Sequence, residues 1–272
     1  MIRIQALFDF YLKSSIHVAL SVYALVRMTQ FMFGIPYDEP IALFAFFGTI
    51  VGYNFVKYDA LARAKKRMMR NELKMIAVLS FFSFLAVGFY FFKLQLITQL
   101  VAVGVLILTL LYTLPFFPNR KNARNWAGVK IYMVSLCWVG VTVLLPLVDA
   151  HYNLNLDFFI KCIQRFILVF VLILIFEIID LANDDPHLKT VPQQIGVKWT
   201  KNLGYLLLMF FCAFEFLNSN IQYSLVSLLL IFGIAIVVAL FLVFANEKRS
   251  KYYTSFWVES VPILWWLLLV LV

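Results

Sequence analysis

Residues 166–184 read FILVFVLILIFEIIDLAND, an apolar run that ends in three acids, Glu177, Asp180 and Asp184. Their spacing of three and then four residues places them on one face if the helix continues to the last acid. Carboxylates at the end of a membrane-spanning helix are costly and usually mark a function. Hard cations such as Mg²⁺ bind carboxylate oxygens together with substrate phosphates. The pattern therefore predicts a site for a divalent cation such as Mg²⁺ at these acids.

Apolar stretches of this kind recur along the whole chain. Hydrophobic residues make up 64% of the 272 residues and charged residues only 14%, which is the composition of an integral membrane protein. Short connections favour a single polytopic membrane domain over residues 1–272. The predicted fold is all-α, with nine transmembrane helices at about 14–33, 39–58, 75–92, 94–114, 129–148, 158–182, 200–217, 221–244 and 254–272.

The basic residues are distributed unevenly between the two sides of these spans. Lys93, Lys161 and Arg165 fall on one side, whereas most of the 23 Lys and Arg residues fall on the other. By the positive-inside rule, the N-terminus is cytoplasmic and the C-terminus lies outside, as in a bacterial-type inner (plasma) membrane. Topology and anionic lipids then explain the net charge of +9, so membrane lipids rather than nucleic acid are the expected partners.

This orientation brings four helix ends to the cytoplasmic face, at residues 54–59, 112–121, 177–189 and 248–251. Acids beside many Lys and Arg residues suit a polyphosphate–metal complex, because carboxylates hold the metal and cations neutralise the phosphates. The alternative is that the basic residues only fix the topology, and this explains most of them. It does not explain the acids, which contribute little to orientation.

The acids and the residues after them form a longer motif. Glu177-x-x-Asp180-x-x-x-Asp184 is followed by Lys189-Thr190-x-Pro192 and Gly196, and this pattern resembles the second aspartate-rich motif of the UbiA superfamily of membrane prenyltransferases. Residues 112–121 resemble the family's loop after the fourth helix. The resemblance implies a helical bundle around a central cavity with a lateral opening to lipid. It also implies Mg²⁺-dependent transfer of a prenyl chain from its allylic diphosphate to an aromatic or lipid acceptor.

The first motif of that family is degenerate in this chain. The family has an asparagine followed by aspartates at the next, fourth and eighth positions. Asn54 is present, but those three positions hold Phe55, Tyr58 and Ala62. Lys57, three residues after Asn54, shares its helix face and supplies a positive charge where the family binds metal.

The resemblance assigns roles to individual residues. Asp180 and Asp184 would hold Mg²⁺, with Glu177 as a third ligand or an orienting neighbour. Lys57 would join the two aspartates as a catalytic residue, because activating a diphosphate leaving group is largely charge neutralisation. The diphosphate itself would contact Asn54, Lys57, Tyr112, Arg120, Lys121 and Lys189.

Two other functions compete with prenyl transfer. The first is a non-catalytic relative that binds an isoprenoid or quinone-like lipid after losing the first metal site. The second is a transporter, since acids within membranes often mark transport paths. Against transport, the acids gather at one end of the bundle and no charged path crosses it.

Two local expectations concern single residues. Pro262 falls inside the last predicted span and predicts a kink there, because proline cannot donate a backbone hydrogen bond. Arg27 in the first span and Glu215 in the seventh lie near the same outer face. They suggest either an ion pair or an arginine that reaches to the membrane interface.

Overall fold

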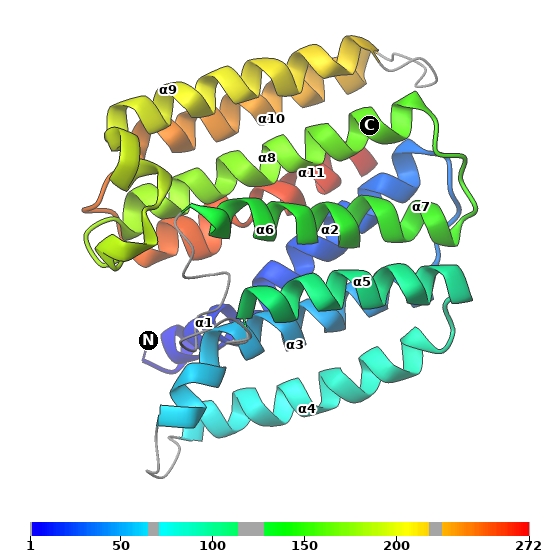
Figure 1. Cartoon of the computed structure of the whole chain (residues 1–272), viewed down its shortest axis with the longest axis horizontal. Coiled ribbons are helices and arrows are strands. Elements are labelled where there is room, and N and C mark those ends of the chain that lie inside the picture. The colour runs from blue at the N-terminus through cyan, green and yellow to red at the C-terminus, as the bar shows by residue number, and fades with distance from the viewer. Residues whose placement is uncertain (1, 65–70, 114–127, 218–224, 272) are drawn as a thin grey trace.

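The computed structural model describes residues 2–64, 71–113, 128–217 and 225–271. Every regular element in these ranges is helical, and most of the long helices run side by side in a layered bundle (Figure 1). The elements are α1 (Ile2–Lys13), α2 (Ile16–Met32), α3 (Glu39–Ala64), α4 (Asn71–Phe91), α5 (Leu96–Thr113), α6 (Val129–Val139), η3 (Gly140–Leu144), α7 (Leu145–Asp149), α8 (Leu156–Asp180), η4 (Pro186–Leu188), α9 (Val191–Ala213), η5 (Phe214–Leu217), α10 (Leu225–Phe244), η6 (Tyr253–Val258) and α11 (Val261–Val270).

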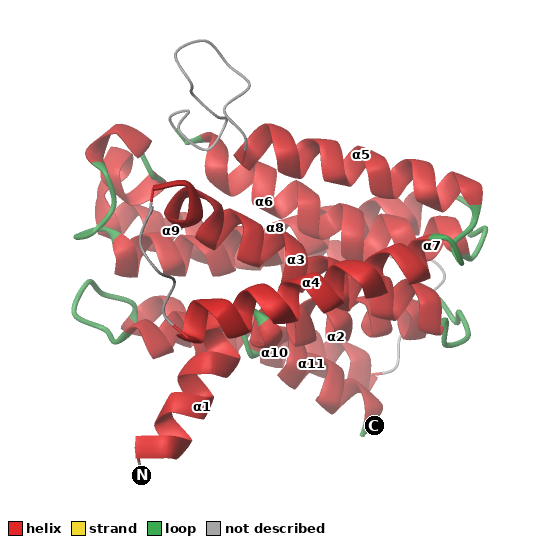
Figure 2. Ribbon diagram, turned by 90° about the horizontal axis from the view of Figure 1, so that it is seen from below, coloured by secondary structure: helices red, strands yellow, loops and turns green. Residues whose placement is uncertain are grey.

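Six helical segments are long and apolar enough to cross a membrane, and three further apolar helices are shorter. Each predicted span overlaps one of these segments, so the chain is an all-helical integral membrane protein, while the number of nine spans stays a prediction. The ends of α3, α5, α8 and α10 lie at the same end of the bundle as α1, and α11 ends at the opposite end (Figure 1). Figure 2 shows α1 projecting from the bundle at an angle to the other helices.

Helix α8 is the centre of the bundle. Its membrane-spanning stretch is 72% buried, against 11% for α4, because α8 packs between α6 and α9 whereas α4 packs mainly on α3. Leu168, Val171 and Ile175 of α8 form part of the main core together with residues of α2, α9, α10 and α11. Four phenylalanines of α4 are exposed, as expected for a helix that faces lipid tails: Phe81, Phe82, Phe84 and Phe89.

Helix α2 packs against helices from both the N-terminal and the C-terminal parts of the chain. It packs against α3 on one side and against α11 on another, so the helix that carries the degenerate first motif and the last helix share a neighbour. The last predicted span is interrupted as Pro262 predicts: η6 ends at Val258, a turn follows, and Pro262 lies in the first turn of α11. Pro262 has no N–H to bond to the carbonyl of Val258, which explains the break.

Candidate functional site at the end of helix 8

The end of α8 differs from the expected continuous helix. The helix stops at Asp180, and the N–H groups of Asn183 and Asp184 both donate to the carbonyl of Asp180, at 2.8 and 2.9 Å. The prediction that one continuing helix carries all three acids is therefore wrong. A tight turn takes its place, and the bond from Asp184 to Asp180 spans the four residues of one helical turn.

Glu177 is almost fully buried, at 2% exposure, and one of its oxygens has a structural partner. Its Oε2 accepts a hydrogen bond from the backbone N–H of Val191 at 3.0 Å. Val191 is the first residue of α9, whose free N–H groups and dipole favour an anion. This contact fits an orienting role for Glu177, because it fixes the end of α8 against the start of α9.

Asp180 and Asp184 lie close enough to repel each other electrostatically. Among the described residues, no hydrogen-bond donor reaches the buried Oδ2 atom of Asp184. Lys130 lies near enough to interact electrostatically with Asp180 and Glu177, and Lys251 with Asp180, although no ion pair within 4.0 Å joins these described residues. The result is a pair of carboxylates with an unsatisfied oxygen, flanked by lysines from two other parts of the chain.

The rest of the second motif builds the loop that holds these groups. The side chain of Asp185 accepts a hydrogen bond from the N–H of His187 at 2.9 Å, which lowers the pKa of that carboxyl below its usual value. Gln193 accepts from the N–H of Thr190 at 3.0 Å and caps α9. Pro192 lies in the first turn of that helix, and Gly196 interrupts it with a φ of +78°.

A backbone contact places the start of α6, which carries Lys130, beside the motif loop. The N–H of Gly128 donates to the carbonyl of Leu188 at 3.1 Å, so the start of α6 is bonded to the motif loop. Gly128 has a φ of +71°, a left-handed conformation that glycine adopts readily. Lys130 follows two residues later, while the predicted phosphate ligand Lys189 is exposed in the same loop.

Asn54, from the first motif, has its polar atoms occupied within the protein. Its Oδ1 accepts from the Ser15 hydroxyl at 2.9 Å, and its Nδ2 donates to the Ser14 carbonyl at 3.1 Å and to the Ser80 hydroxyl at 2.9 Å. Ser15 lies between α1 and α2 in a left-handed conformation with a φ of +64°. Asn54 of α3 thus links α4 to the turn between α1 and α2.

Lys57 lies one turn further along α3. Its Nζ donates to Ser15 Oγ at 3.1 Å and lies 5.8 Å from the ring centroid of Tyr53. The charge of Lys57 is attracted to Glu259, near the start of α11. Among the described residues, no hydrogen bond or ion pair joins Lys57 to Asp180 or Asp184. The two motif regions therefore form separate polar clusters.

The structure does not describe the side chains of three predicted diphosphate ligands. Arg120 and Lys121 lie outside the described residues, as does the side chain of Tyr112. Conversely, the sequence interpretation did not single out Lys130 or Glu259, and it placed Lys251 at the cytoplasmic face only as part of residues 248–251. The sequence could have indicated Glu259 as a candidate functional residue, because it is an acid within a predicted transmembrane span.

The donor set at the end of α8 fits a small, hard cation. Among the described residues, no cluster of three or more His, Cys, Asp or Glu side chains is placed to hold a metal. Two carboxylates are nevertheless enough for Mg²⁺ when substrate phosphates and water complete its coordination. The unpaired Oδ2 of Asp184 is the observation that favours such a ligand.

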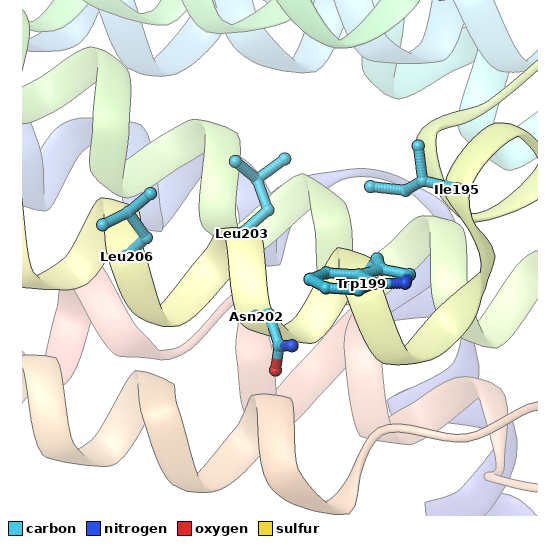
Figure 3. Close-up of a pocket in the computed structure, with 5 residues that line it drawn as sticks. All are labelled: Ile195, Trp199, Asn202, Leu203 and Leu206. Carbon is cyan, nitrogen blue, oxygen red and sulfur yellow. The ribbon is translucent and has the colours of Figure 1, made fainter.

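A surface groove of about 570 Å³ lies along α9. Figure 3 shows its lining residues, Ile195, Trp199, Asn202, Leu203 and Leu206. The lining has one polar side chain and no charged one, so this groove suits a hydrocarbon chain rather than a diphosphate.

Solved structures share this architecture along nearly the full chain. A UbiA homologue from Archaeoglobus fulgidus bound to Cd²⁺ has a TM-score of 0.62 and 15% identity, covering 94% of this chain and 97% of its own. The A. fulgidus UbiA homologue bound to GPP and Mg²⁺ has a TM-score of 0.59 and 13% identity, covering 95% and 97%. A digeranylgeranylglyceryl phosphate synthase has a TM-score of 0.57 and 14% identity, covering 97% and 96%.

No family model matches the sequence, and no curated protein matches it. The protein is thus an integral membrane helical bundle with an acid pair at one end. Its fold is that of the UbiA homologues, which confirms at the level of the fold the resemblance of the second motif.

Proposed function

We propose that this protein is a membrane prenyltransferase of the UbiA superfamily. It would move a prenyl chain from an allylic diphosphate to an aromatic or lipid acceptor at the cytoplasmic end of the bundle. The observation that carries the proposal is the pair Asp180 and Asp184, with an unsatisfied buried oxygen and flanking lysines, on a UbiA fold. The A. fulgidus homologue bound to GPP and Mg²⁺ supports this donor class.

Each group of the α8 cluster has a role in this proposal. Asp180 and Asp184 would hold Mg²⁺, and the bound metal would supply charge neutralisation for the diphosphate leaving group. Lys130 and Lys251 offset the remaining phosphate charge from two sides, together with Lys189 in the motif loop. Glu177 orients the acids through its bond to Val191 and does not need to bind the metal. Arg120, Lys121 and Tyr112 remain proposed diphosphate ligands.

A second candidate is a non-catalytic protein that binds an isoprenoid or quinone-like lipid. It is favoured by the first motif, where no family carboxylate is present and Asn54 is fully engaged in helix packing. With one acid cluster instead of two, a prenyl diphosphate would bind without being ionised. Where both candidates bind a prenyl diphosphate, turnover separates them.

The test uses purified protein in detergent with geranyl, farnesyl or geranylgeranyl diphosphate, Mg²⁺ and a panel of aromatic and glycerol-phosphate acceptors. Diphosphate release is measured for the unmodified protein, for Asp184→Asn and for Asp185→Asn. Asp185 is a matched control because it neighbours Asp184 but is exposed and bonded to His187.

Release that requires Mg²⁺ and Asp184, but not the Asp185 carboxylate, is the result expected of an enzyme. Binding without release across the whole panel would favour the lipid-binding candidate. If no prenyl diphosphate binds, the prenyltransferase proposal is wrong, and the second candidate is limited to lipids without a diphosphate.

A further inference from the structure

A second surface groove, of about 470 Å³, is formed by α10, the start of η6 and the connection between them. It lies towards the end of α10 that is at the same end of the bundle as α1 (Figure 1). Its lining residues are Val237, Leu240, Phe241, Phe244, Arg249 and Tyr253. The four from α10 are spaced by three, one and three residues, so they share one helix face over about 10 Å. Unlike the groove along α9, this groove joins an apolar wall to a charged side chain.

Arg249 is held in position at the charged end of the groove. Its Nε donates to the carbonyl of Phe244 at 3.0 Å, and Phe244 is the last residue of α10, where carbonyls lack helical partners. The guanidinium carbon lies 5.4 Å from the ring centroid of Tyr253 and 6.0 Å from that of Phe244. Among the described residues, no hydrogen bond engages the two terminal nitrogens of Arg249. These two nitrogens form the fork that binds two phosphate oxygens in parallel.

The wall of the groove is formed by contacts between its two sides. The Tyr253 hydroxyl donates to the carbonyl of Phe241 at 2.7 Å, and the two rings meet edge to face with centroids 5.5 Å apart. The connection before Tyr253 is also fixed. The Asn246 side chain accepts from the N–H of Lys248 at 3.0 Å and donates to the carbonyl of Phe244 at 3.1 Å. The groove is therefore preformed, as ligand sites usually are.

The charged end of the groove is suited to anionic headgroups. Lys248 and Lys251 lie beside Arg249 in the chain, and Glu247 is the one acid among residues 245–252. All four side chains are exposed. The positive-inside pattern predicts that this end of the bundle faces the cytoplasmic leaflet, whose anionic lipids attract basic residues. Basic pockets between transmembrane helices on that side commonly bind anionic headgroups.

We propose that this groove binds one anionic glycerophospholipid of the cytoplasmic leaflet. An acyl chain lies along Val237, Leu240 and Phe244, and the phosphate contacts the guanidinium of Arg249. Burial of the chain supplies affinity, whereas the cations select the headgroup. A zwitterionic phospholipid meets the same apolar wall, but its positive headgroup is repelled by Lys248 and Lys251. The lining contains no carboxylate that could hold a metal, so a metal-bound prenyl diphosphate fits this groove less well than a phospholipid.

The test measures binding of phosphatidylglycerol and of phosphatidylcholine to the purified, delipidated protein in detergent by native mass spectrometry. We expect phosphatidylglycerol to bind the more tightly at one site. Arg249→Gln should raise its Kd by about fivefold or more, the loss expected for one basic residue at an anionic surface. The matched control is Lys198→Gln, which removes the same charge from an exposed position of α9 outside the groove and should leave the Kd unchanged.

A second variant tests the apolar wall without changing any charge. Leu240→Trp fills the groove and should also weaken the binding of phosphatidylglycerol several-fold. Leu229→Trp adds the same bulk to α10 outside the lining and should have no effect. Both leucines are exposed, at 51% and 61%, so the fold has room for the larger side chain at either position.

Three results would overturn the proposal. The first is equal affinity for the two phospholipids, and the second is an equal loss in Arg249→Gln and Lys198→Gln, which would indicate unspecific attraction. The third is displacement of the bound phosphatidylglycerol by geranylgeranyl diphosphate, which would assign the groove to the prenyl donor. Neither measurement involves prenyl transfer, so failure of this proposal leaves the proposed function intact.

Discussion

The carboxylate of Glu177 and the backbone N–H of Val191 form a 3.0 Å hydrogen bond that joins the end of α8 to the start of α9. Since Asp180 ends α8 and Asp184 lies in the connection to α9, this bond helps to fix the proposed metal ligands. A residue whose sequence context predicts a metal ligand thus has a structural contact that constrains the site.

Two replacements of Glu177 should distinguish the effect of its charge on stability from the effect of its hydrogen bond to the N–H of Val191. Glu177→Ala leaves the N–H of Val191 without its partner, so we expect a loss of about 1–3 kcal/mol in unfolding free energy. Glu177→Gln keeps an acceptor and should lose less. Thermal unfolding in detergent measures both variants. Equal stability of the Ala variant and the unmodified protein would show that the bond contributes nothing.

The Asn54 cluster should be important for stability whatever the protein's function. Asn54→Ala removes hydrogen bonds to Ser14, Ser15 and Ser80 in a buried position, and we expect a loss of about 2–3 kcal/mol. Thermal unfolding of the variant, beside the surface variant Glu72→Gln, measures this effect. If the Asn54 variant were as stable as the surface variant but failed to bind the diphosphate, Asn54 would be a ligand instead.

The turn at Asp185 should depend on pH. Hydrogen bonds from His187 lower the pKa of Asp185, so the folded turn is favoured above the ordinary aspartate pKa of about 4 and loses this stabilisation as the pH falls through the lowered value. Hydrogen exchange at residues 185–190 should therefore accelerate in acid. Asp185→Asn, which keeps the acceptor oxygen without its titration, should abolish this acceleration. Protection that does not change down to the lowest accessible pH would contradict the assignment.

The sequence predicted the features that depend on local pattern. Apolar length and the positions of charges locate all the described long helices, and the acids with Lys189, Thr190 and Pro192 identify the second motif. Pro262 predicts the break before α11 because its missing N–H acts within its own helix.

Contacts between distant segments were not predictable in this way. The attraction between Lys57 and Glu259 depends on the packing of both α3 and α11 against α2. The local sequence of neither helix indicates that they share this neighbour. The suggested pair of Arg27 and Glu215 is wrong for the same reason. Arg27 donates to Gln30 at 2.8 Å and stacks on Tyr37, while Glu215 accepts from Lys161 and Gln164.

The most direct test of the proposed site is equilibrium binding of geranylgeranyl diphosphate to the purified protein with and without Mg²⁺. The structure predicts that Mg²⁺ tightens binding, and that Asp180→Asn or Asp184→Asn each removes this effect, raising the Kd by about tenfold or more. Asp185→Asn should bind as the unmodified protein does. Binding that is equally tight without Mg²⁺, or unaffected in the Asp180 and Asp184 variants, would contradict the assignment of the end of α8 as the diphosphate–metal site.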